Sequence, residues 1–164
     1  MPSNTLESVA GMPTSVLPEI KTQPVILMIE DDPNDAALAE RAFKEATVPH
    51  WLIRLHDGEQ AIKYLGRQPP YTDPDVNPLP VLILLDLKMP KITGLEVLAW
   101  LRTQPKLAAI PVVILTGSVL ETDRADAQKL GAAAYEVKPL SFKALLEIIQ
   151  GIGTRWLDRP VPSP

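Results

Sequence analysis

The chain has 164 residues, enough for one domain with a hydrophobic core and short tails. Its 16 basic and 20 acidic residues give a net charge of -4, which offers no broad attraction for nucleic acid, and without cysteine there is no disulfide, thiolate metal site or thiol nucleophile. The start of the sequence lacks the basic flank and apolar stretch of a signal peptide, and no apolar run is long enough to cross a membrane, so we expect a cytoplasmic protein.

The first part of the sequence predicts an arm followed by a buried strand. Residues 1–22 mix proline, serine, threonine and isolated apolar residues without a helical or strand period, so we expect this stretch to be disordered. A short, continuously apolar run at 25–29 is typical of a strand covered on both faces, and it ends in three acids at 30–32. Pro33 suits the first turn of a helix, which Pro49 prevents from continuing.

The middle of the chain predicts two strands separated by a proline-rich segment. A strand at 51–55 leads through a turn to a helix that begins near Gly58. Residues 66–80 contain five prolines, which exclude a helix or a central strand and predict a long surface loop. The third strand, at 81–86, precedes a helix from about 94 to 103.

The last part of the chain repeats the same alternation twice. A strand at 111–116 precedes a helix at about 121–130, and a strand at 132–137 precedes an amphipathic helix that starts at Ser141. Residues 158–164 are few and rich in proline, so we expect a tail there rather than an output module.

Strict alternation of five strands and five helices predicts the architecture. It indicates an α/β fold with a doubly wound, five-stranded parallel sheet and right-handed crossovers. We expect a single domain over 23–157, with the proline-rich loop at 66–80 inside it. In open sheets of this kind, ligands bind outside the carboxyl ends of the strands. The residues that end the strands are therefore the candidates for function.

Polar side chains follow the strands at this edge. They are Glu30 and Asp31 after the first strand, Asp86 after the third, Thr116 at the end of the fourth and Lys138 after the fifth. Three neighbouring carboxylates repel one another, so we expect a divalent cation between them. Mg²⁺ prefers oxygen ligands and commonly takes one or two carboxylates together with phosphate oxygens, so the pattern indicates a site for a phosphoryl group.

The same residues suit phosphoryl chemistry. Asp86 is the candidate nucleophile, because carboxylates form covalent aspartyl-phosphate intermediates. Lys138 provides a point charge that can pair with Asp86 and later with a phosphate oxygen, and Thr116 provides a hydroxyl that can donate to the same oxygen. Simpler interpretations exist for single residues: Asp86 could cap the following loop, and helix capping explains Asp32 without a metal.

Four motifs in order make the chain resemble a response-regulator receiver domain of two-component signalling from 26 to about 150. The resemblance implies a flavodoxin-like (βα)5 receiver fold. The matching segments are Ile29-Glu30-Asp31-Asp32, Leu85-Asp86-Leu87-Lys88-Met89-Pro90 with Gly94, Leu115-Thr116-Gly117, and Val137-Lys138-Pro139.

The resemblance implies roles for individual residues. Asp86 would accept a phosphoryl group from a histidine kinase or a histidine phosphotransfer protein. Asp31, Asp86 and the backbone carbonyl of Lys88 would bind Mg²⁺, with Glu30 contributing through water. A receiver is a phosphoacceptor rather than a turnover enzyme, with at most slow self-phosphorylation from small donors and self-dephosphorylation.

The resemblance also implies a switch. Thr116 and Tyr135 would form its pair, the hydroxyl moving toward the phosphate while the ring turns inward, although Tyr135 also suits a strand aromatic that only packs. The bond between Lys138 and Pro139 is expected to be cis, a state that proline permits. With no output module, the expected result is altered protein binding at the surface of the fourth helix, fifth strand and fifth helix, roughly 121–150.

Within this family, one subgroup is the most similar. The long loop at 66–80, the run LDLKMPK at 85–91 and the ending at 149–157 resemble stand-alone regulators paired with bacterial phytochrome kinases. Members of that subgroup often form dimers through the region equivalent to 121–150. We expect neither a nucleic acid nor a membrane as a partner.

Three other functions compete with this interpretation. A phosphatase of the haloacid-dehalogenase type uses the same nucleophile but usually has a second acid two residues later, where this chain has Lys88. A receiver-like interaction module that is never phosphorylated would not need the complete acidic and basic set. A flavodoxin-like FMN protein would need a Ser/Thr/Gly-rich loop after the first strand, where the acids at 30–32 would repel the phosphate of FMN.

Overall fold

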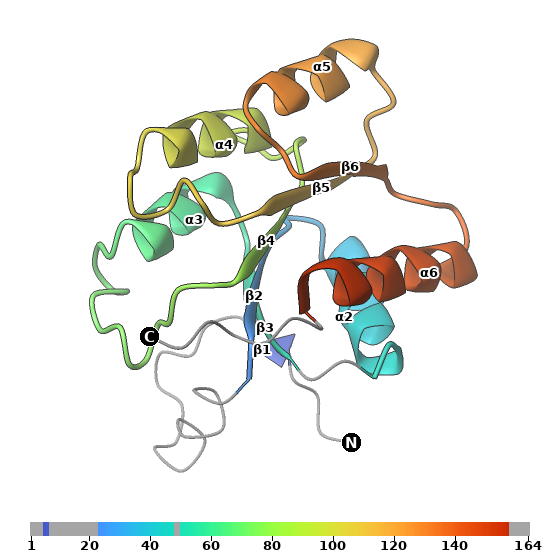
Figure 1. Ribbon diagram of the computed structural model, residues 1–164, viewed down its shortest axis with the longest axis horizontal. Coiled ribbons are helices and arrows are strands. Elements are labelled where there is room, and N and C mark those ends of the chain that lie inside the picture. The colour runs from blue at the N-terminus through green and yellow to red at the C-terminus, as the bar shows by residue number, and fades with distance from the viewer. Residues whose placement is uncertain (1–4, 7–22, 48–49, 158–164) are drawn as a thin grey trace.

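The computed structural model describes residues 5–6, 23–47 and 50–157. They form one parallel sheet with helices on both faces (Figure 1). The strand order is β1-β3-β2-β4-β5-β6. The strands are β1 (Thr5–Leu6), β2 (Val25–Ile29), β3 (Trp51–Leu55), β4 (Leu82–Leu85), β5 (Val112–Thr116) and β6 (Ala134–Val137).

The five longer strands confirm the predicted doubly wound sheet. Strands β2, β3, β4 and β5 are buried along their whole length, as their apolar sequences require when helices cover both faces. Strand β2 lies between β3 and β4, so the chain winds outward from it in both directions. Such a reversal is the topological switch point at which open α/β sheets bind ligands.

The two-residue strand β1 adds a sixth member at the edge of this sheet. Thr5 pairs with Leu52 and Leu6 pairs with Ile53, both in parallel register. For these two residues the expectation of disorder over 1–22 was wrong, because the outer edge of β3 offers unpaired backbone groups to which a short segment can bind. The rest of the expected arm and the expected tail at 158–164 lie outside the described residues.

Two layers of helices cover the sheet and enclose two cores (Figure 1). One core lies under α3, α4 and α5, and the other lies under α2 and α6. No helix in the described part of the chain has the length and apolar character of a membrane span. The helices are α2 (Pro33–Glu45), α3 (Gly58–Leu65), α4 (Gly94–Arg102), α5 (Glu121–Lys129) and α6 (Phe142–Ile152), which continues as the π-helix η2 (Gly153–Leu157).

The proline-rich segment is a loop between α3 and β4, as predicted, and side chains attach it to the domain. The Tyr64 hydroxyl donates to the carbonyl of Pro78 at 2.7 Å, and its ring packs on Tyr71 with 5.2 Å between ring centroids. The Arg67 guanidinium donates to the carbonyl of Asn77 at 2.9 Å. The loop therefore packs against α3 at the end of the sheet away from the candidate site.

Candidate functional site

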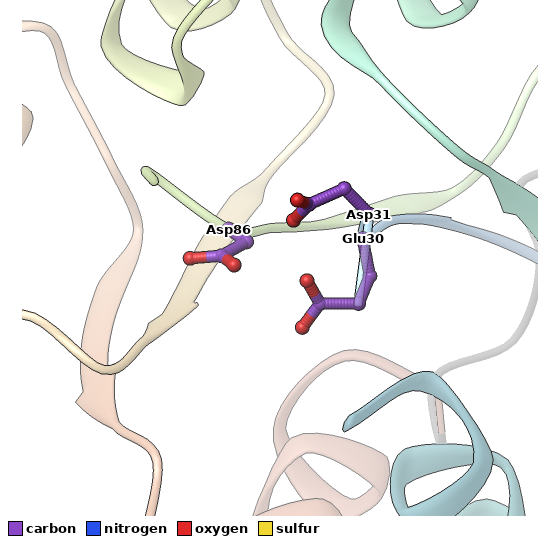
Figure 2. Close-up of side chains that lie close together, drawn as sticks. All are labelled: Glu30, Asp31 and Asp86. Carbon is purple, nitrogen blue, oxygen red and sulfur yellow. The ribbon is translucent and has the colours of Figure 1, made fainter. Parts of the chain in front are cut away.

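Three carboxylates converge at the switch point of the sheet. Glu30 and Asp31 directly follow β2, and Asp86 directly follows β4. Because Ile29 pairs with Leu85, the two strands end at the same level and bring the three side chains together. Oxygen atoms of the three carboxylates lie within 4.8 Å of one another. Figure 2 shows them facing a shared space between the two strand ends, as the sequence predicts.

The ammonium group of Lys138 lies against this acidic cluster. Its Nζ is 2.5 Å from Glu30 Oε1 and 3.1 Å from Asp86 Oδ2, so the predicted pairing with Asp86 is present. Its third partner is Asp35 Oδ2, at 2.7 Å. Asp35 lies in the first turn of α2, where an acid is commonly explained by the helix dipole, and sequence reasoning did not assign it to the site.

Burial and charge shift the ionisation of this cluster. Burial raises the pKa of Glu30 to about 8, the neighbouring Asp86 adds to the increase, and Lys138 opposes it. Burial lowers the pKa of Lys138, but hydrogen bonds from its ammonium group to Asp35 and Glu30, with the charge of Asp86, outweigh that effect and raise it. Lys138 is thus a cation at neutral pH, yet one ammonium group does not neutralise the neighbouring carboxylates. The oxygen-rich, negatively charged donor set fits a hard divalent cation.

Two residues hold the end of β2 in place. Asp32 caps α2, accepting from the backbone N–H groups of Asn34 at 2.8 Å and Asp35 at 3.1 Å, and these bonds lower its pKa. The capping interpretation therefore accounts for Asp32. From β3, the buried Arg54 donates to the carbonyl oxygens of Glu30 at 3.2 Å and Asp31 at 3.4 Å. Sequence reasoning missed Arg54, although a charge inside an apolar strand is a signal for such a role.

Gly94 allows the loop after Asp86 to close tightly. A Cβ atom at this position would collide with the carbonyl oxygen of Asp86 and the Cα of Leu87. The backbone N–H of Gly94 instead donates to the carbonyl of Leu87 at 3.0 Å. The glycine is therefore required by the close approach of α4 to the candidate phosphoacceptor.

Thr116 and Tyr135 lie on the neighbouring strands β5 and β6. Thr116 is fully buried, and its hydroxyl oxygen accepts from the backbone N–H of Ser118 at 3.3 Å. Tyr135 is half-buried, with its hydroxyl donating to the carbonyl of Ser118 at 3.0 Å and its ring 4.5 Å from the guanidinium carbon of Arg124. Both residues of the predicted switch pair are thus bonded to the same loop residue.

Lys88 also extends the site toward α5. Its backbone N–H donates to Asp86 Oδ1 at 3.3 Å, and its Nζ pairs with Asp123 Oδ2 at 3.0 Å. The same Asp123 oxygen accepts from the Ser118 hydroxyl at 2.5 Å. Sequence reasoning considered only the backbone carbonyl of Lys88 and did not identify Asp123 or Ser118.

A comparison with protein-family models matches residues 26–150 to the response regulator receiver domain. The match covers most of the chain and all the strand ends described above. The chain belongs to this receiver family. Response regulators of this family receive phosphate from histidine kinases. The three alternatives, a phosphatase, an FMN protein and an interaction module that is never phosphorylated, are therefore not favoured.

Two stand-alone response regulators of this family are similar to the chain in sequence and in structure. Response regulator Rcp1 of Synechocystis sp. is 41% identical over 134 residues, which cover 82% of this chain and 89% of that protein. The crystal structure of its Mn²⁺-bound form has a TM-score of 0.77 with 40% identity, covering 85% of this chain and 99% of that one. The phosphorylated cyanobacterial phytochrome response regulator RcpA has a TM-score of 0.78 with 36% identity, covering 86% and 99% of the two chains.

One expectation for this receiver was wrong. Among the described residues, the cis peptide bond joins Pro69 to Pro70, and the bond between Lys138 and Pro139 is trans. The trans form is favoured for proline by about 0.5–1 kcal/mol, and the long lysine side chain reaches three carboxylates from it. No cis bond is needed to aim the ammonium group in this structure.

Proposed function

We propose that Asp86 is the phosphoacceptor of this receiver and that Asp31, Asp86 and the carbonyl of Lys88 hold Mg²⁺, with Glu30 contributing through water. The observation that carries the proposal is the convergence of Glu30, Asp31 and Asp86 beside the Lys138 ammonium group. Bound Mg²⁺ would supply positive charge to the phosphoryl oxygens during transfer.

The transfer itself is a displacement at phosphorus. A carboxylate oxygen of Asp86 attacks the phosphorus of a phosphohistidine, the P–O bond forms, and the P–N bond breaks. The electron pair of the broken P–N bond goes to the imidazole nitrogen of the donor, and the ring leaves as neutral imidazole because its other nitrogen carries a proton before the transfer. Lys138 stays protonated and exchanges its contact with Asp86 for one with a phosphoryl oxygen. The product is an acyl phosphate on Asp86.

A pocket lies beside this group, and we propose that the donor approaches Asp86 from it. Its polar part is formed by the residues of the cluster, and its apolar part is formed by residues of β2, β4, β5, α2 and α6. The residues that line it include Glu30, Asp35, Leu38, Ala39, Asp86, Lys138 and Leu145.

The new phosphoryl oxygens would then bias a two-state equilibrium. The Thr116 hydroxyl moves from its contact with Ser118 to donate to a phosphoryl oxygen, and Tyr135 turns inward into the space that opens. These movements change the surface formed by α5, β6 and α6. The likeness to the phytochrome response regulator RcpA supports a phytochrome-type histidine kinase as the donor. We propose a homodimer through this surface as one output.

Intact mass spectrometry tests the phosphoacceptor. Wild type incubated with acetyl phosphate and Mg²⁺ should gain one phosphoryl group, and Asp86→Asn should gain none, because the amide is not a nucleophile for phosphorus. Asp126→Asn is a matched control, since Asp126 is exposed on α5 and should not alter the adduct. An equal adduct on Asp86→Asn would contradict the assignment.

Two further measurements test the partners. Transfer from a purified phytochrome kinase should outpace transfer from an unrelated histidine kinase at equal concentration. Light scattering should show a larger mass for the phosphorylated than for the unphosphorylated protein. Equal transfer rates would refute the phytochrome pairing, and an unchanged mass would refute dimerisation as the output.

A further inference from the structure

Asp123 is a buried carboxylate that the proposed phosphotransfer does not use. It lies in the first turn of α5 and is 9% exposed. One of its oxygens, Oδ2, accepts from the Ser118 hydroxyl at 2.5 Å and pairs with Lys88 Nζ at 3.0 Å. The Ser118 hydrogen bond and then the Lys88 contact hold its pKa below the ordinary value, so Asp123 is charged at neutral pH.

Asp123 joins the two loops on either side of the candidate phosphoacceptor. Lys88 belongs to the loop after β4, and its N–H donates to Asp86 Oδ1. Ser118 belongs to the loop after β5, where its N–H donates to the Thr116 hydroxyl and its carbonyl accepts from Tyr135. A chain of contacts therefore runs from Asp86 through Lys88, Asp123 and Ser118 to both residues of the switch pair.

The bond to Ser118 is the stronger of the two contacts of Asp123. It is short, charge-assisted and formed between two buried residues. The ammonium group of Lys88 belongs to a side chain that is 60% exposed, and ion pairs of that kind contribute little. The position of the loop after β5 therefore depends chiefly on Asp123 and Ser118.

This arrangement opposes the movement that the switch requires. While Asp123 binds the Ser118 hydroxyl, the Ser118 backbone is held in place. The Ser118 N–H then occupies the Thr116 hydroxyl oxygen, and its carbonyl holds the Tyr135 hydroxyl. Movement of Thr116 toward Asp86 and of Tyr135 inward both require this segment to shift.

We propose that Asp123 is a positioning residue that stabilises the resting conformation of the loop after β5 and thereby weakens binding of a phosphoryl group. The inference rests on the proposed function, because it concerns the equilibrium that the phosphoryl group biases. When a ligand binds only the shifted conformation, its apparent affinity falls as the resting conformation becomes more populated. Removing the Asp123 contacts should therefore tighten binding, which a merely structural role would not do.

Binding of beryllium fluoride, which mimics an acyl phosphate on a carboxylate, measures this effect in the presence of Mg²⁺. By calorimetry, Asp123→Ala should bind the mimic about fivefold more tightly than wild type, the change expected for loss of one net hydrogen bond. Ser118→Ala should tighten binding in the same direction, because it removes the other partner of this hydrogen bond. Asp126→Ala, which removes an exposed acid from the same helix, should leave the affinity unchanged.

Amide NMR spectra of the unliganded proteins give an independent readout. Leu120 is a suitable reporter beside Ser118, because its N–H donates to the Ser118 hydroxyl oxygen at 3.3 Å. The signals of both residues in Asp123→Ala should move part of the way toward their positions in wild type bound to the mimic. Failure of wild type to bind the mimic would refute the proposed function. Binding by wild type, with equal or weaker binding by folded Asp123→Ala and Ser118→Ala, would refute the role of Asp123 alone. Thermal denaturation identifies the folded variants, and Ser118→Ala decides the question if Asp123→Ala does not fold.

Discussion

Lys138 shows how single residues set the electrostatics of the site. Its ammonium group contacts Glu30, Asp35 and Asp86, which arrive from two strand ends and a helix. Burial of these groups strengthens their interactions but also penalises each uncompensated charge. The raised pKa of Glu30 is the result, because burial penalises its charged form and the contact with Lys138 does not fully offset that penalty.

The pKa of Glu30 predicts a pH dependence of stability. Its folded value of about 8 lies above its ordinary value of 4.5, so between these values the unfolded chain binds fewer protons than the folded one. The contribution of Glu30 to stability is thus complete below about pH 4.5 and is lost as the pH rises toward 8. Urea denaturation in EDTA should show this loss with a slope of at most about 1.4 kcal/mol per pH unit for one proton. Glu30→Gln should have a shallower slope, and equal slopes in the two proteins would contradict the shift.

The hydrogen bonds of Arg54 lead to a second prediction at the scale of a single residue. Its guanidinium holds the carbonyl groups of Glu30 and Asp31, so Arg54→Met should misplace both carboxylates. Residues that orient metal ligands typically alter metal affinity by about 10- to 100-fold, and we expect a loss of about tenfold in Mg²⁺ affinity by calorimetry. Arg41→Met is the control, because Arg41 is exposed on α2 and its partners, Glu45 and the Phe142 ring, lie outside the acidic cluster. Unchanged Mg²⁺ affinity in folded Arg54→Met would refute this role.

Helix ends are the elements that complete the site. The first turn of α2 supplies Asp35, the first turn of α5 supplies Asp123, and the start of α4 passes close to Asp86 at Gly94. Each of these turns follows a strand that ends at the same edge of the sheet. The helices therefore both cover the cores and deliver polar groups to the site.

A pair of glycine substitutions tests the close approach of α4. In Gly94→Ala the new methyl group collides with backbone atoms of Asp86 and Leu87, so we expect a loss of about 1–3 kcal/mol in the free energy of unfolding. In Gly151→Ala the methyl group meets no atom within 4 Å near the end of α6, where the helix continues into η2, so we expect a gain of up to about 1 kcal/mol. Urea denaturation of both variants measures these changes. Equal effects would show that crowding at Gly94 is unimportant.

At the scale of the whole molecule, one sheet couples two helical layers. The core under α3, α4 and α5 and the core under α2 and α6 pack on opposite faces of the same strands. The candidate site lies where both layers reach the switch point, with Asp35 from one layer and Asp123 from the other. A change at Asp86 can therefore affect both faces.

This architecture predicts cooperative unfolding. Leu98 in α4 and Ile149 in α6 are buried in different cores. Leu98→Ala and Ile149→Ala should each lower the free energy of unfolding by about 2–5 kcal/mol, because each leaves a cavity. Circular dichroism and tryptophan fluorescence should give coincident urea transitions for both variants, since the two layers share their strands. Separate transitions for the two probes would contradict a single cooperative unit.

The sequence alone predicted the alternation of strands and helices along the chain and the residues that end the strands. Apolar runs identify strands buried on both faces, and the carboxyl ends of parallel strands meet at one edge, so Glu30, Asp31, Asp86 and Lys138 could be brought together without a structure. The pairing of Thr5 and Leu6 with β3 could not be predicted, because two residues carry no periodic pattern.

The tertiary structure decided which other side chains reach the site. Asp35 and Asp123 had the pattern of ordinary acids in first helical turns, and Arg54 that of an isolated charge in a strand. Their roles depend on how helices and neighbouring strands pack, which spacing along the chain does not specify. The same holds for the trans bond at Pro139, since both isomers are accessible to proline and the surrounding contacts select one. The sequence determined the strand ends, because each buried strand is an apolar run that stops where the polar residues begin. The contacts of Asp35, Asp123, Ser118 and Lys88 arise only once the helical layers pack on the sheet.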